Sequence, residues 1–153
     1  MRYMKKLTLS LSFILLVVLS CTKANHINPS SLKGTWQEYE TDGSFAGTNF
    51  RISFYEDGNF QMLLVNYTDM LPLDPNDSCM YSHYDYIKGQ FSVTGNVLHF
   101  TGNYTDKDFQ VITPNCQGNT DFENSFVSSL KRNSLVMNVN ASDEWKKIKM
   151  KRE

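Results

Sequence analysis

The sequence predicts an all-β protein, built as an eight-stranded antiparallel up-and-down barrel. Apolar and polar residues alternate in short runs, which is typical of strands with one buried face. Turn-forming residues separate these runs, and the Asp57-Gly58 pair between two alternating runs is a strong hairpin signal. Closely spaced strands joined by short turns are typical of closed barrels and sandwiches.

The second strand of the series alternates clearly, with Phe50, Ile52 and Phe54 on one face, and the Asp57-Gly58 turn joins it to the third. A second hairpin is expected around Thr94-Gly95-Asn96, and the last run alternates apolar residues with lysines. The full set of expected strands is 35–41, 49–55, 59–66, 82–93, 97–105, 121–131, 134–139 and 144–151.

Two positions leave the local structure open. Residues 121–131 carry apolar residues whose spacing fits a helix as well as a strand face, and their context among strands favours a strand. Gly89 lies where the apolar alternation changes phase, from Tyr84 and Tyr86 to Phe91, which indicates a bulge or a barrel corner.

The first twenty residues have the pattern of a secretory signal peptide. A basic opening with Arg2, Lys5 and Lys6 precedes the apolar run 7–19, and the small Ser20 ends it. The apolar run is shorter than the roughly 20 residues that a membrane-spanning helix needs. Residues 1–20 are therefore expected to be removed.

The end of this leader, Val18-Leu19-Ser20-Cys21, resembles the lipobox of bacterial lipoproteins. That resemblance implies cleavage before Cys21 and acylation of its thiol and new amino group, so the expected partner is a membrane. The alternative is an ordinary signal peptide with an incidental cysteine. Several acyl chains on one residue make a stable anchor. The polar residues 21–31 are expected to be a tether, and residues 32–153 the barrel domain.

The charge balance is mildly acidic. Loss of the leader leaves twelve basic and sixteen acidic residues, so the net charge changes from −1 to −4. The sequence has no basic stripe of the kind that nucleic-acid binding requires, and nucleic acid is not an expected partner.

Cys79 and Cys116 form an even pair in a chain expected to enter an oxidising compartment, which predicts a disulfide. Two buried free thiols are the alternative. The bridge would close a loop long enough to stabilise the fold by roughly 4 kcal/mol in the chain-entropy model.

The motifs of the common enzyme classes are absent from the sequence. It has no nucleophile elbow, phosphate loop, HExxH pair or dinucleotide fingerprint. A His83 and His99 pair lacks the third group that a metal or acid–base site requires. The sequence therefore predicts no enzyme activity, no cofactor and no metal.

The Gly34-Thr35-Trp36 start, the meander of strands and the basic last strand resemble the lipocalin-like barrels. With the LKGTW opening soon after the lipobox and the FYEDGNF hairpin, the chain looks similar to small lipocalin-like lipoproteins of Bacteroidetes. The resemblance implies a non-enzymatic barrel that binds a small molecule. It implies that Trp36 closes one barrel end, that Gly34 gives the backbone room, and that Lys149 or Arg152 covers the indole.

Large side chains occupy nearly every expected interior position. The candidate interior or ligand-facing residues are Tyr84, Tyr86, Phe100, Tyr104, Met62 and Met137. A filled core and a small apolar pocket both fit this pattern. Leu63, Val65 and Ile87 are expected on the outer phase, as an exposed patch or beneath a loop.

Two classes of function therefore stay open. In the first, a tethered barrel binds a small apolar or amphipathic molecule and contains a cavity. In the second, a tethered interaction or inhibitor module has a solid core and binds a protein or glycan through loops near 69–82 and 115–119. The expected location is the bacterial outer membrane. The periplasmic face is favoured over the cell surface because the tether lacks the acidic residues that the resemblance associates with surface export.

Overall fold

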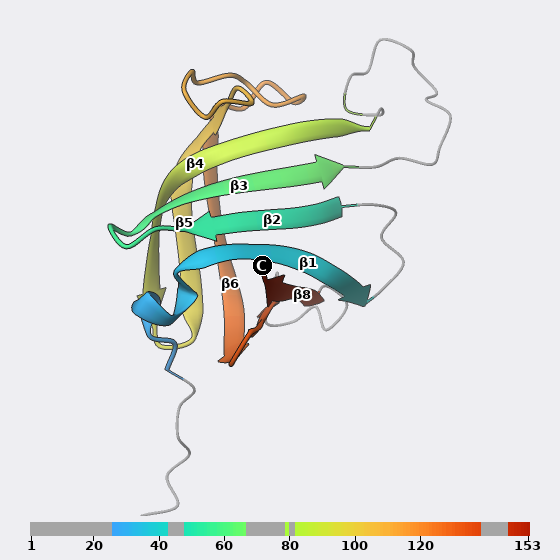
Figure 1. Cartoon of the computed structure of the whole chain (residues 1–153). Helices are drawn as coiled ribbons and strands as arrows, with labels where there is room; N and C mark the ends of the chain where they lie inside the picture. Colours follow the sequence, from blue (N-terminus) through green and yellow to red (C-terminus); the bar gives the residue numbers. More distant parts are fainter. Residues whose placement is uncertain (1–25, 43–47, 67–78, 80–81, 139–146) are drawn as a thin grey trace, which may run out of the picture.

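The computed structural model describes residues 26–42, 48–66, 79, 82–138 and 147–153 (Figure 1). The expected signal peptide and Cys21 lie outside the described residues. Among the described residues, no helix combines the length and the apolar character needed to cross a membrane.

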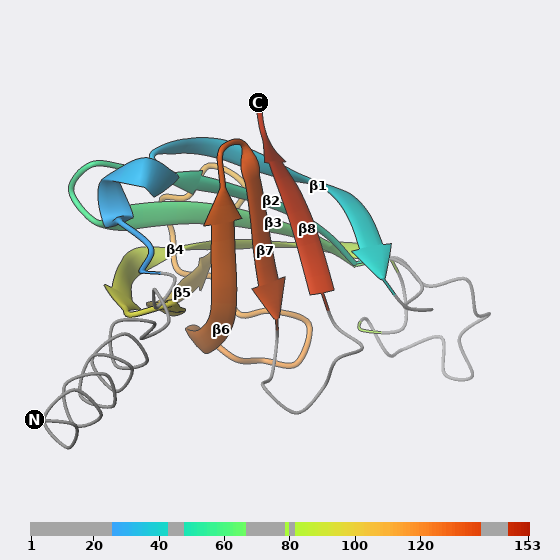
Figure 2. The ribbon, with the colours of Figure 1, turned by 90° about the horizontal axis from the view of Figure 1, so that it is seen from below.

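The structure confirms an all-β, closed, antiparallel up-and-down barrel, in which each strand pairs with the next and β8 pairs with β1 (Figures 1 and 2). The strands are β1 Gly34–Asp42, β2 Thr48–Phe54, β3 Asn59–Asn66, β4 His83–Thr94, β5 Val97–Thr105, β6 Asp121–Lys131, β7 Ser134–Asn138 and β8 Lys147–Arg152. One 3-10 turn, η1 Pro29–Leu32, precedes β1. The segment 121–131 is a strand, as its context indicated.

The two ends of the barrel differ in their connections. The short turns 55–58, 95–96 and 132–133 lie at the end that η1 covers, which we call the turn end. The described loop 106–120 lies at the opposite end, which we call the loop end (Figure 1).

The barrel interior is filled by apolar side chains that contact one another. Four aromatic pairs in and around this core pack edge to face, because the positive ring edge of one lies against the negative face of the next. Phe100 forms two of them, with Phe60 at 4.9 Å and with Phe126 at 5.7 Å between ring centroids. The buried apolar residues are Ile27, Leu32, Trp36, Ile52, Phe54, Phe60, Met62, Ile87, Leu98, Phe100, Phe126, Leu135, Met137, Ile148 and Met150.

The predicted orientation of β4 is wrong in its first half. Tyr84 is 61% exposed and stacks on Tyr86 on the outside of the barrel, with ring centroids 6.4 Å apart. Ile87, expected outside, is fully buried. The register of β4 against β3 runs without a shift, so the alternation does not slip at Gly89. The tyrosines were misplaced because aromatic side chains suit either face of a sheet.

Gly89 is a corner of the barrel and not a bulge. It lies opposite Gly102 of β5, and the two backbones approach so closely that a Cβ on Gly89 would lie 2.0 Å from the carbonyl oxygen of Thr101. A Cβ on Gly102 would lie 2.2 Å from the carbonyl oxygen of Lys88. Both glycines are needed for β4 and β5 to approach so closely at this point. Figure 1 shows that β4 is strongly bent along its length.

The folded domain begins earlier than expected. Ile27 and Leu32, assigned respectively to the tether and to the domain boundary, are both buried in the core. The Asn28 side chain caps η1 by accepting a hydrogen bond from the Ser30 backbone N–H. The Ile27 N–H also donates to the carbonyl of Gly95 at 3.1 Å. The expected tether 21–31 is therefore wrong from Ile27 onward, because this segment packs over the turn end.

Candidate functional site

Trp36 closes the turn end of the barrel. Its indole is fully buried, and its Nε1–H donates a 2.7 Å hydrogen bond to the carbonyl oxygen of Leu32 in η1. Gly34 has a φ of +114°, which a glycine adopts more readily than other residues, and this lets the chain turn from η1 into β1. Because the indole is fully buried, a ligand cannot reach it from solvent, and its position is that of a side chain that closes the barrel end.

The cation over the indole is Arg152. Its guanidinium carbon lies 4.7 Å from the Trp36 ring centroid, and Arg152 pairs directly with Trp36 in the β1–β8 ladder. Lys149, the other candidate, lies on the phase opposite to Ile148 and Met150 and so faces away from the core. Arg152 also donates to the carbonyl of Ser31, which ties η1 to β8.

The candidate interior residues have three different outcomes. Met62, Phe100 and Met137 are fully buried within the packed core. Tyr104 is partly buried against that core towards the loop end. Tyr84 and Tyr86 lie outside the barrel and face no interior ligand.

Polar groups gather on the inner face at the loop end. The Asp85 side chain is only 12% exposed, and its Oδ2 accepts a 3.0 Å hydrogen bond from the Asn66 amide. The Nε2 of His83 lies 3.6 Å from the same oxygen. Burial raises the pKa of Asp85, against the opposing effect of His83 and the Asn66 hydrogen bond. Burial also raises the pKa of Tyr104, partly opposed by a hydrogen bond with Asn115.

The predicted disulfide is confirmed. Cys79 and Cys116 are bonded, with Cα atoms 5.1 Å apart. The bridge ties the β3–β4 connection to the loop 106–120, and so joins two loops at the loop end.

The two histidines do not form a pair. His83 lies at the loop end beside Asn66, whereas His99 pairs with Ser92 on β4 and bonds the Ser125 hydroxyl through Nδ1 at 2.8 Å. Within the described parts of the chain, no three His, Cys, Asp or Glu side chains gather as they would around a metal ion.

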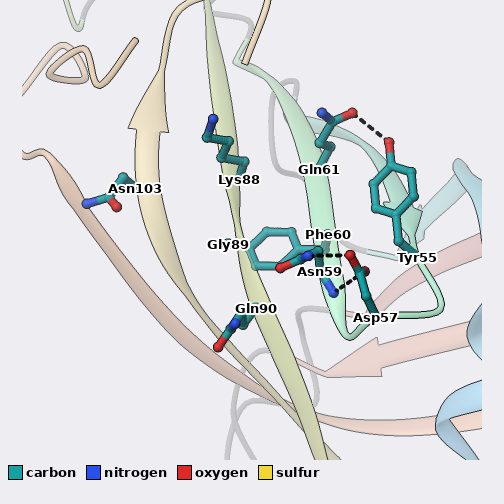
Figure 3. A pocket seen from close by; sticks show the side chains of 9 residues that line it. All are labelled: Tyr55, Asp57, Asn59, Phe60, Gln61, Lys88, Gly89, Gln90 and Asn103. Atoms are coloured by element: carbon teal, nitrogen blue, oxygen red, sulfur yellow. Dashed lines mark hydrogen bonds between the residues drawn. The ribbon is translucent and has the colours of Figure 1, made fainter. Parts of the chain in front are cut away.

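A groove of about 480 Å³ lies on the outer face of the barrel, between the β2–β3 turn and the bend of β4 and β5 (Figure 3). Its volume falls in the range of about 300–1,000 Å³ that is typical of ligand sites. We call it the Tyr55 groove. It is lined by Tyr55, Asp57, Asn59, Phe60, Gln61, Lys88, Gly89, Gln90 and Asn103.

The turn that forms one wall of this groove is held by its own hydrogen bonds. The Asp57 carboxylate accepts from the backbone N–H of Asn59 at 3.1 Å and from its amide at 2.6 Å, and the backbone bond lowers the pKa of Asp57. The Tyr55 hydroxyl donates to Gln61 Oε1 at 2.7 Å. The Phe91 N–H donates to the carbonyl of Gly58 at 2.8 Å and ties the turn to β4.

The opposite wall of the groove is fixed in the same way. Lys88 Nζ donates to the carbonyl of Phe109 at 2.5 Å, and the Asn103 amide donates to Asp121 at 3.0 Å. Gln90 makes no side-chain hydrogen bond within the part of the chain that the structure describes.

This groove was not predictable from the sequence. Its residues come from the β2–β3 turn and from β3, β4 and β5, and apart from Phe60 and Gly89 each one alone looks like an ordinary solvated surface residue. Two features of it are visible in the sequence: the Asp57-Gly58 turn, which forms one wall, and Gly89, which lies at the bend. Their proximity depends on the strand register.

Comparisons of the chain with protein-family models, with curated proteins and with solved structures gave no match.

Proposed function

We propose that the protein is a membrane-anchored, non-catalytic binding barrel that holds its partner on the outside of the barrel. The observation that carries this proposal is the packed interior. Fifteen apolar side chains are buried among the described residues, and they include the edge-to-face rings of Phe60, Phe100 and Phe126. An eight-stranded barrel can be filled by side chains in this way, which leaves the outer surface for recognition.

The anchor is the lipid expected on Cys21. The lipobox-like VLSC stretch after a basic and apolar leader supports it. The location that fits is the outer membrane, with the periplasmic face preferred because the segment after Cys21 carries no acidic residue.

Such an anchor would orient the barrel. Ile27 is buried at the turn end, and the six residues from Cys21 to Ile27 reach at most about 20 Å. The lipid would therefore hold the turn end close to the membrane. The loop end, with the disulfide, would point away from it.

Substitution of the anchor residue tests this part of the proposal. The Cys21→Ala chain should leave the membrane fraction of its host and appear in the soluble fraction after cell lysis and ultracentrifugation. Cys79→Ser/Cys116→Ser is the control, because it removes two cysteines without touching the leader. A Cys21→Ala chain that stays with the membranes would contradict lipid anchoring.

A second candidate function is the binding of a small apolar or amphipathic molecule at the loop end. The specific observation in its favour is a set of apolar side chains on the inner face that are only partly buried. They lie at the same end as the polar side chains of Asp85, Asn66 and His83. These apolar side chains are Phe50, Leu64, Tyr104 and Phe122. A molecule with an apolar body and a hydrogen-bond donor would suit this combination.

Native mass spectrometry separates the two candidates. The full chain, expressed in its own host and released from membranes in mild detergent, is expected to have the mass of the lipidated polypeptide alone if the partner binds outside. A stoichiometric small molecule, lost after Leu64→Trp or Phe122→Trp fills the loop end, would replace the first proposal with the second. Tyr39→Trp, on an exposed tyrosine, is the matched control.

A further inference from the structure

We propose that the Tyr55 groove binds a neutral oligosaccharide. This inference rests on the proposed binding function and names the class of its partner. It is carried by the chemistry of the groove lining, by the exposed aromatic ring on its wall, and by the rigidity of both walls.

The lining is rich in carboxamides, which match hydroxyl groups. Each amide of Asn59, Gln61, Gln90 and Asn103 carries both donors and an acceptor, and a sugar hydroxyl is likewise both donor and acceptor. The internal bonds of the groove use the Gln61 carbonyl oxygen and amide N–H groups of Asn59 and Asn103. The Gln61 amide N–H and the whole Gln90 amide have no partner within the described residues, so they can bond a ligand.

Tyr55 supplies the aromatic surface. It is 44% exposed, and its ring is positioned by the hydroxyl bond to Gln61 (Figure 3). A pyranose ring presents an apolar C–H face between its hydroxyls, and an exposed tyrosine can pack against that face while its polar tip stays hydrogen-bonded.

The hollowed surface continues beyond the groove. Tyr55 also lines two further hollows, of about 420 Å³ and about 350 Å³, which extend towards η1 and the start of β1. Lys33 and Glu56 line both of these hollows and form an exposed ion pair. A surface hollowed on several sides of one tyrosine suits a chain of sugar units better than a single unit.

Other ligand classes fit the groove less well. An anion would meet the Asp57 carboxylate, whose lowered pKa keeps it ionised, while the Lys88 ammonium is already bonded to the carbonyl of Phe109. An apolar ligand would bury amides without hydrogen-bond partners, which is costly. A neutral ligand with many hydroxyls avoids both penalties.

The groove is also formed before any ligand arrives. Asp57 and Gly58 lock the turn, while Lys88 and Asn103 are held on the other side. Binding therefore orders few side chains, and this reduces the entropic cost of association.

The test is binding of the full chain to an immobilised panel of neutral oligosaccharides made of hexoses and N-acetylhexosamines. The chain is kept in a polyoxyethylene detergent, because the sugar head of a glycoside detergent would compete. At least one member of the panel should bind. Tyr55→Ala and Gln90→Ala should each weaken that binding by about tenfold, as loss of a central contact does. Tyr39→Ala, on a 56% exposed tyrosine of β1 outside the groove, should leave it unchanged.

Each other outcome overturns the inference. These outcomes are no binding to any neutral oligosaccharide, binding of anionic sugars only, or equal binding by wild type and Tyr55→Ala. Thermal unfolding of each variant establishes that it is folded. If instead a protein partner binds and Tyr55→Ala abolishes the complex, the saccharide inference fails while binding on the outer face stands.

Discussion

Trp36 shows how one side chain can join three parts of the fold. It bonds the carbonyl of Leu32 in η1, lies in the β1–β2 and β1–β8 ladders, and carries the Arg152 guanidinium on its face. A cation over an indole contributes about 0.5–1 kcal/mol or more, and the larger share comes from burial of the ring.

Trp36→Ala should therefore lower the free energy of unfolding by roughly 3–5 kcal/mol, the usual cost of truncating a large buried aromatic. Urea denaturation followed by circular dichroism measures this. The exposed Tyr39→Ala is the control and should change stability little. Oligosaccharide binding by the folded Trp36→Ala fraction should persist. Selective loss of binding at full stability would show that Trp36 belongs to a binding site instead.

Asp85 provides a prediction about pH. Its pKa is raised above its ordinary value by burial, so the carboxylate ionises less readily in the folded chain than in the unfolded one. The folded state is then favoured below the ordinary pKa, and this contribution is lost as the pH rises through the raised pKa. His83, Asn66 and Tyr104 are the polar groups that face it.

Asp85→Asn removes the ionisation and keeps an oxygen for the Asn66 amide. Its stability relative to wild type should be higher at about pH 7 than at about pH 3. Urea denaturation at both pH values measures the difference. Asp108→Asn, at an exposed loop position, should show a smaller pH effect. If the stability of Asp85→Asn relative to wild type is instead lower at neutral pH than at acid pH, then His83 stabilises the ionised Asp85 more than burial destabilises it.

At the scale of elements, the bend of β4 and β5 depends on two glycines that face each other. No side chain fits at Gly89, because a Cβ would meet the backbone of Thr101 and Gly102. The bend matters beyond the core, since Gly89 also lies in the wall of the Tyr55 groove between Lys88 and Gln90.

Gly89→Ala should destabilise the barrel by about 1–3 kcal/mol, the range seen when a methyl group is forced into packed structure, and it should also weaken binding in the groove. Chemical denaturation and the oligosaccharide panel measure the two effects. Thr94→Ala, at an exposed position on the same strand, is the control. Unchanged stability of Gly89→Ala would mean that the strands can separate at this point without cost.

The strands themselves were largely predictable from the sequence. Seven of the eight expected strands begin and end within two residues of the observed ones, because alternation and turn residues act locally. Positions 144–146 of the eighth expected strand lie outside the described residues, and its described part, Lys147–Arg152, ends one residue later than expected. The inner face of β4 was not predictable, since Tyr84 and Tyr86 look like core residues until Ile87 is placed against Met62 and Tyr104. Arg152, Asp85 and the Tyr55 groove were missed or left open for the same reason: their roles depend on register between strands.

At the scale of the whole molecule, the disulfide acts on a barrel that is already closed by strand pairing. Its 37-residue separation spans β4 and β5, so its main effect is on the unfolded chain. The Cys79→Ser/Cys116→Ser chain should lose about 4 kcal/mol of stability in the chain-entropy model.

Urea denaturation with and without a reducing agent checks this. Reduction should lower the unfolding midpoint of the wild type to that of the double variant. The midpoint of the double variant should be the same with and without the reducing agent. A wild-type midpoint that reduction leaves unchanged would contradict the prediction.

The pairing of β8 with β1 has a consequence for behaviour at high local concentration. Open sheets expose unpaired N–H and C=O groups along their outermost strands, and these can recruit strands from other chains into aggregates. Here every strand has a neighbour on each side, so the sheet offers no long template for such growth. If the chain is lipid-anchored as proposed, copies crowded together in the plane of a membrane would be protected from edge-to-edge assembly by topology alone.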